Sequence, residues 1–179
     1  MKILTAIYDS PVKLLQKATR DGEALVLALS TCDESAVRDS LFNFAVSAYH
    51  LWDWVKAFRP DLKDKVSALL DSSSSLRACR DLCNASKHVA LELTSAAYRN
   101  HPPVVVDVRV SATSATSMRN TTEESASVPH TAIEGVLPAP RPPWRLKIQM
   151  NDGHTIRAEA LVSGVLGVWA QFFADNCIL

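Results

Sequence analysis

The segment from Asp33 to the residue before Pro60 constrains the fold more than any other part of the chain. Its apolar residues recur at steps of three and four, the spacing that places side chains on one face of an α-helix. They are Val37, Leu41, Phe44, Ala48, Leu51, Val55 and Phe58. Further apolar residues lie on almost the opposite side, and a helix that is apolar nearly all round is normally buried. We therefore expect this helix to be the central element of the fold.

Four further helices and three strands are expected around it. Helical patterns cover residues 10–29, 61–70, 74–93 and 159–174. The first begins at Ser10, a capping residue followed by proline at the first helical position, and Gly22 is its weak point. Alternating apolar residues predict strands at 104–110, 144–150 and 155–158. Residues 151–154 contain Asp-Gly, which readily adopts positive φ, and predict a hairpin turn.

These elements predict an α+β fold that is predominantly α, in a single domain over residues 1–179. A bundle of about four helices (1–95) precedes a small antiparallel sheet (103–158), and a C-terminal helix (159–176) closes the fold. Residues 111–143 interrupt the sheet with a polar, proline-rich segment without periodicity, which we expect to be a flexible loop. The predicted core includes Phe44, Leu51, Trp52, Trp169 and Phe172.

The composition excludes several classes of protein. Apolar residues make up 47% and charged residues 21% of the chain, as in ordinary globular proteins. Nineteen basic residues balance nineteen acidic ones, so a site for nucleic acid or an anionic membrane would have to be local. No apolar run approaches the roughly 18 residues that span a bilayer. The N-terminus does not resemble a signal peptide. Three of the four cysteines (Cys32, Cys79, Cys83 and Cys177) lie in or at the end of helical patterns among apolar neighbours, as reduced cysteines do. We expect a cytoplasmic protein without a membrane partner.

The segment 76–89 carries the most informative polar pattern. On a helix at 100° per residue, its apolar residues and both cysteines fall on one side. The polar residues Arg77, Asp81, Asn84 and His88 form a stripe on almost the opposite side, flanked by Arg80 and Lys87. One interpretation is a solvated face with ordinary ion pairs. The other is a site in which His88 exchanges a proton and an arginine holds a phosphate.

The central helix has a polar seam of its own. Asn43 and His50 are seven residues apart, with Ser47 between them and Asp53 three residues after His50. On so apolar a helix these groups need hydrogen-bond partners, which predicts either a structural network or a catalytic role.

No metal or cofactor is expected. Three residues separate Cys79 from Cys83, which is not a usual zinc-ligand spacing, and His88 points away from both. The chain contains no phosphate-binding glycine loop, serine elbow or paired-carboxylate motif.

Arg80 followed by the polar Asp81, with His88 later on the same helix, resembles the pattern of the HEPN superfamily of small helical proteins. Members carry an arginine, usually followed by a polar residue, and a histidine four to six residues further on. Seven residues separate Arg80 from His88, one more than in that pattern. The resemblance covers about the first 95 residues, as a helical bundle.

Many HEPN proteins are metal-independent ribonucleases that act as homodimers in bacterial toxin–antitoxin and antiviral defence systems. The resemblance implies an RNA partner and a homodimer, in which Arg80 contacts the scissile phosphate and His88 moves the proton. The alternative is a non-catalytic module, an accessory or neutralising subunit, that binds a protein partner through the polar stripe and the loop 111–143. The candidate catalytic residues are Arg80, His88, Asn84 and Asp81, and the candidate binding residues are Arg77, Lys87, Asn43 and His50.

Overall fold

The computed structural model describes residues 8–31, 33–85, 103–112 and 144–178. Its elements in chain order are α1 (Pro11–Ala28), α2 (Glu34–Phe58), the 3-10 helix η1 (Pro60–Leu62), α3 (Lys63–Ser72), α4 (Ser74–Ala85), β1 (Val105–Ala112), β2 (Trp144–Met150), β3 (Thr155–Arg157) and α5 (Ala158–Asp175). The fold is α+β and predominantly α, as the sequence predicts. The expected continuation of α4 to residue 93 lies outside the described residues.

Capping residues set where the two longest N-terminal helices begin. The Ser10 hydroxyl accepts a hydrogen bond from the Lys13 amide (3.4 Å) at the start of α1. The Asp33 carboxylate accepts hydrogen bonds from the Ser35 and Ala36 amides (2.8 and 3.2 Å) at the start of α2. Side chains of this type satisfy amides that have no partner inside the helix.

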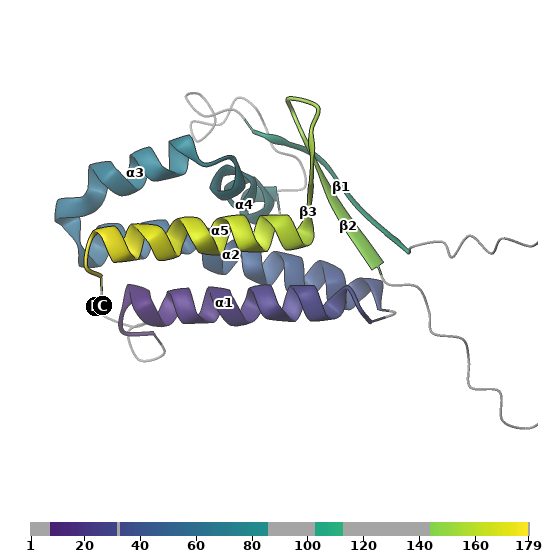
Figure 1. Ribbon diagram of the computed structural model, residues 1–179, viewed down its shortest axis with the longest axis horizontal. Helices are drawn as coiled ribbons and strands as arrows, with labels where there is room; N and C mark the ends of the chain where they lie inside the picture. Colours follow the sequence, from purple (N-terminus) through teal and green to yellow (C-terminus); the bar gives the residue numbers. More distant parts are fainter. Residues whose placement is uncertain (1–7, 32, 86–102, 113–143, 179) are drawn as a thin grey trace, which may run out of the picture.

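The central position expected for α2 is confirmed. It contacts α1, α3, α4, α5 and β1. Figure 1 shows α1 and α5 side by side with α2 behind them, α4 nearly end on, and the sheet at one end of these helices. The indole Nε1 of Trp169 on α5 donates a hydrogen bond to the Ala48 carbonyl of α2 (3.0 Å), which satisfies this polar atom in the core.

Four of the five predicted core residues are buried: Phe44, Leu51, Trp169 and Phe172. The fifth, Trp52, is only half-buried. It lies at the edge of α2, where its ring stacks on Tyr49 (6.1 Å between centroids) and the Lys56 ammonium lies 3.5 Å from the ring centroid. The amphipathic pattern places Trp52 at the border of the buried face of α2, and part of its side chain remains accessible to solvent there.

The three strands form an antiparallel sheet in the order β1–β2–β3. Gly153 has φ +90° in the β2–β3 turn, as the Asp-Gly pair predicts. The β2 residues Leu146, Ile148 and Met150 are buried against the helices. Strand β1 extends through Ser111 and Ala112, so the expected loop does not begin at residue 111. The rest of that loop, 113–143, lies outside the described residues.

Candidate functional site

Arg80 and Asp81 of α4 are buried, not solvent-exposed as the helical projection predicts. Their exposed fractions are 5% and 1%. One Asp81 oxygen accepts hydrogen bonds from Arg80 Nε (2.9 Å) and contacts Arg80 Nη2 (2.8 Å). The other accepts from the Val104 and Val105 amides (2.5 and 3.2 Å). The Asp81 carboxylate therefore joins α4 to the start of β1.

The expectation of an exposed polar stripe on α4 is wrong at Arg80 and Asp81 for a physical reason. The helix contacts α2, α3, α5 and β1, so neighbours cover its polar side as well as its apolar side. Arg77 and Asn84 are half-buried, and Arg77 Nε has no hydrogen-bond partner among the described residues. Lys87 and His88 lie outside the described residues, so their predicted roles stay predictions.

The polar seam of α2 divides into three environments. Ser47 is buried and bonds to Lys17 and Asp21 of α1, which makes it a structural contact between the two helices. Asn43 is exposed, so it does not belong to a buried network. His50 is half-buried. The seam is therefore not one continuous site.

His50 lies between two polar partners at the α2–α4 contact. Its Nδ1 is 3.7 Å from Asp53 Oδ2, and its Nε2 is 4.0 Å from the Cys83 sulfur. Such an order of thiol, imidazole and carboxylate is the order used in nucleophilic catalysis. Here both distances are long, and Cys83 is fully buried, so no substrate reaches the thiol in this conformation. The neighbouring Cys79 is also buried, and burial raises the pKa of its thiol. Cys177 is exposed.

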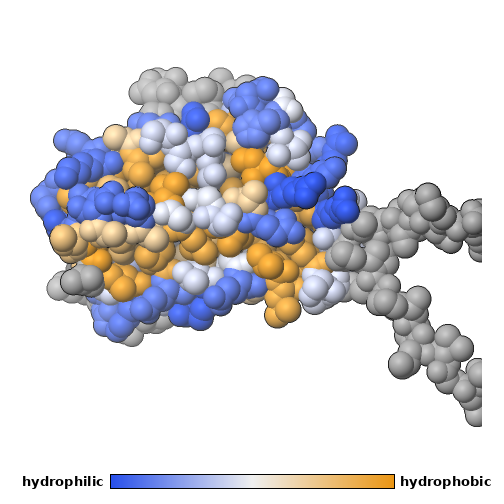
Figure 2. Space-filling model, in the orientation of Figure 1, coloured by the Kyte–Doolittle hydropathy of each residue, from blue (hydrophilic) through white to orange (hydrophobic). Residues whose placement is uncertain are grey.

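The outer face of the sheet gathers basic residues that the sequence did not single out as a site. Register places Arg109 opposite Lys147, Ser111 opposite Arg145, and Lys147 opposite Arg157. Opposite residues on one face of an antiparallel pair have Cβ atoms about 4.5–5.5 Å apart. Four cations from three strands thus share one surface, which we call the basic face: Arg109, Arg145, Lys147 and Arg157. Figure 2 shows strongly hydrophilic side chains gathered over the strands and the start of α5.

Most of this positive charge has no ion pair among the described residues. Asp107 pairs with Arg109 (Nε–Oδ2 2.6 Å), and that hydrogen bond holds the pKa of the Asp107 carboxyl below its ordinary value. Within the described part of the chain, Arg145, Lys147 and Arg157 form no ion pair. A cluster of cations without counter-charges attracts anions and can bind phosphate groups.

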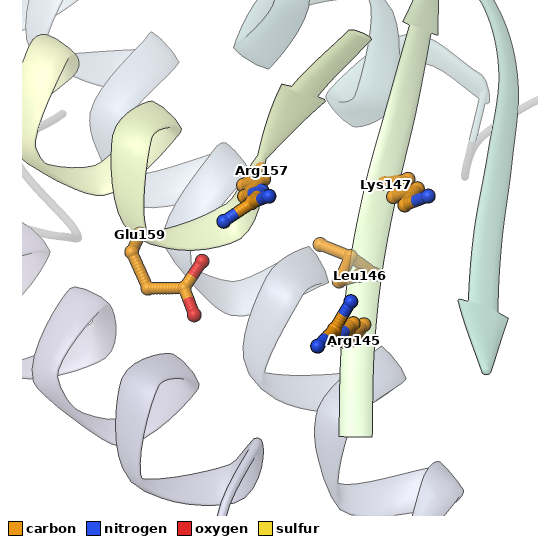
Figure 3. Close-up of a pocket in the computed structure, with 5 residues that line it drawn as sticks. All are labelled: Arg145, Leu146, Lys147, Arg157 and Glu159. Atoms are coloured by element: carbon orange, nitrogen blue, oxygen red, sulfur yellow. The ribbon is translucent and has the colours of Figure 1, made fainter. Parts of the chain in front are cut away.

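Two hollows lie on this face. The wider is shallow, encloses about 460 Å³, and is lined by Asp107, Arg109, Ser111, Lys147, Gln149 and Thr155. The smaller encloses about 90 Å³ and is lined by Arg145, Leu146, Lys147, Arg157 and Glu159. Figure 3 shows Arg145 and Lys147 along β2, with Arg157 and Glu159 coming from β3 and the first turn of α5. The basic face is thus the candidate functional site.

The described residues also bear on metal binding and on membrane-spanning helices. Among them, no group of three His, Cys, Asp or Glu side chains could hold a metal ion. Of the helices they form, none has the length and apolar character needed to cross a bilayer.

The chain was also compared with known proteins. Neither protein-family models, nor curated proteins, nor solved structures give a match.

Proposed function

We propose that this protein binds RNA through the basic face of its sheet. One observation carries the proposal: a chain with no net charge places Arg145, Lys147 and Arg157 together on one surface, without ion pairs among the described residues. Contacts to phosphates supply most of the affinity of proteins for nucleic acids, and they require such local clusters of cations. The choice of RNA among polyanions comes from the resemblance of residues 80–88 to the HEPN pattern.

Of the two activities that this resemblance implies, we propose RNA binding and not RNA cleavage. A residue that contacts a scissile phosphate must reach it, whereas the Arg80 guanidinium is buried beside Asp81. The homodimer, the protein partner and the role in bacterial defence remain predictions.

The basic face also indicates how RNA would be held. The outward side chains of β1, β2 and β3 are charged or polar: Asp107, Arg109, Ser111, Arg145, Lys147, Gln149, Thr155 and Arg157. None of them is aromatic, and stacking on aromatic rings is the usual way to grip unpaired bases. The described part of the face would therefore contact the phosphate backbone with little preference for sequence.

Charge reversal tests the proposal directly. We expect the double variant Arg145→Glu, Lys147→Glu to lose binding to a short labelled RNA, measured by fluorescence anisotropy. The slope of log affinity against log salt should fall in magnitude by roughly 0.7 for each phosphate that the variant no longer neutralises. The matched control is Lys63→Glu, Lys65→Glu, which makes the same change in charge on α3, away from the sheet (Figure 1).

The control separates a site from a general charge effect. If both double variants weaken binding equally, the effect comes from net charge and the basic face is not the site. If the wild-type protein binds no RNA, the proposed function is wrong.

A further inference from the structure

The smaller hollow of the basic face differs from the rest of the sheet surface in its charge. Three cations, Arg145, Lys147 and Arg157, line it, and Glu159 is the single carboxylate. No ion pair joins Glu159 to these cations within the described residues. The hollow therefore has two positive charges in excess, whereas the neighbouring Asp107–Arg109 pair is neutral. A ligand with a double negative charge fits this balance better than one with a single charge.

The size of the hollow limits the ligand. It encloses about 90 Å³, well below the roughly 300 Å³ or more of typical pockets for small molecules. A group of a few atoms fits, whereas a nucleobase with its ribose does not. A phosphate group meets both limits, because a monoester carries a charge of about −1.5 to −2 at neutral pH.

The backbone beside the hollow adds to its preference for anions. Arg157 is the N-cap residue of α5, and no side chain of the described residues caps the first amides of that helix. Helix α5 has 18 residues, and the free amides at the start of a helix carry partial positive charge. This contribution reinforces the three side chains that already define the hollow.

We propose that the hollow between Arg145, Lys147 and Arg157 binds a phosphate monoester. This rests on the proposed function for its source, which is then the terminal phosphate of an RNA strand. An internal phosphodiester carries one negative charge and leaves one cation of the hollow unmatched. The protein would thus recognise phosphorylated RNA ends over internal positions.

The test compares one RNA in three forms: with a 5′-phosphate, with a 3′-phosphate, and with hydroxyl groups at both ends. At neutral pH we expect one phosphorylated form to bind about tenfold more tightly than the hydroxyl form, because the additional charge makes charge-assisted hydrogen bonds. The preferred form identifies which end is bound. The preference should shrink as the pH falls below about 6, where the dianion takes up a proton and becomes a monoanion.

Two substitutions in the hollow should act in opposite directions. Arg157→Gln should remove the preference for a phosphorylated end, whereas Glu159→Gln should increase it, because the opposing carboxylate is lost. The matched control is Arg109→Gln, on the same face but outside the smaller hollow. This substitution should lower the affinity for all three RNAs by the same factor. Circular dichroism checks that each variant is folded.

The outcomes distinguish this inference from the proposed function. Equal affinity for all three RNAs overturns the monoester site and leaves RNA binding intact. If no RNA binds, inorganic phosphate is titrated while the backbone amide signals of residues 145–147 and 157–159 are followed by NMR. Saturable shifts there keep the monoester site and refute its RNA source, and the absence of shifts overturns both.

Discussion

Asp81 shows how one side chain can hold two elements together. Its carboxylate accepts hydrogen bonds from the Arg80 guanidinium on α4 and from the Val104 and Val105 amides at the start of β1. A buried carboxylate is tolerated only when such partners satisfy it. Arg80 depends on Asp81 in turn, because its charge is buried as well.

Asp81→Asn should therefore destabilise the protein strongly. The neutral amide removes the charge that pairs with the buried Arg80 guanidinium, and breaking a buried ion pair typically costs about 3–5 kcal/mol. Urea unfolding measures the change. The control is Asp107→Asn, which breaks an ion pair of similar geometry on the exposed sheet face and should leave unfolding close to wild type. Two equally small effects would contradict the structural role of Asp81.

The sequence identifies Arg80 and Asp81 as notable residues, but it predicts that both are exposed, whereas both are buried. A helical projection shows which residues share a face, and it correctly places Leu76, Cys79 and Cys83 in the core. It cannot show that β1 covers the other side of α4, because that contact comes from residues more than 20 positions later in the chain.

At the scale of the elements, two helical glycines predict opposite responses to the same substitution. A Cβ on Gly22 of α1 would lie 2.8 Å from Val162 Cγ1 on α5 and 3.2 Å from Phe44 Cε2 on α2. A Cβ on Gly167 of α5 would meet no atom of another described element within 4 Å. Gly22 is thus the point where three helices approach closely, and not only a weak point of α1.

We expect Gly167→Ala to stabilise the protein by about 0.5–1 kcal/mol, the usual advantage of alanine inside a helix. Gly22→Ala should have the opposite sign, because overpacking a core typically costs about 1–3 kcal/mol. Thermal unfolding of both variants checks this pair. Stabilisation by Gly22→Ala would show that Val162 and Phe44 move aside easily.

The helices and strands themselves follow well from the sequence. Apolar periodicity, capping residues and the Asp-Gly turn are local signals, and they locate α1, α2, β2 and α5 to within one or two residues. Strand β1 is longer than predicted because Ser111 and Ala112 look like loop residues in isolation. They become strand through pairing with Arg145 and Trp144, which a local pattern does not reveal.

At the scale of the whole molecule, the sheet and the helices share one hydrophobic core. Leu146 and Ile148 of β2 belong to the same buried cluster as Phe44 and Trp169. The Trp144 amide also donates a hydrogen bond to the Leu29 carbonyl after α1 (2.8 Å). Loss of packing in the sheet should therefore destabilise the helices as well.

Ile148→Ala tests this coupling. Removing a fully buried isoleucine typically costs about 2–5 kcal/mol. We expect the helical signal in circular dichroism and the tryptophan fluorescence to shift together to a lower melting temperature. The neighbour Lys147→Ala, on the outer face, should stay within about 0.5 kcal/mol of wild type. Separate transitions for the two signals would indicate that the sheet unfolds alone.

The basic face is likewise a property of the whole molecule, because it forms only when the strands pair. One of its cations comes from β1 and three from the β2–β3 hairpin, more than 30 residues later, and the balanced charge of the whole chain hides them. Each strand shows alternation, but only the register between strands shows that Arg109, Lys147 and Arg157 lie next to one another. Composition and local spacing therefore did not predict the candidate site.

The register shift in β1 has a consequence for how this chain can vary. Val105 pairs with Met150 and Asp107 with Gln149, so β1 contains one residue more than β2 at this point. Asp81 fixes the strand before the additional residue, and the basic face begins after it. Deleting that residue would make the pairing regular and leave Arg109 opposite Lys147, whereas deleting Val108 would shift the register and turn Arg109 toward the core. Among relatives of this protein, the additional residue can therefore be absent without loss of the basic face, while single insertions and deletions between residues 107 and 111 should be selected against.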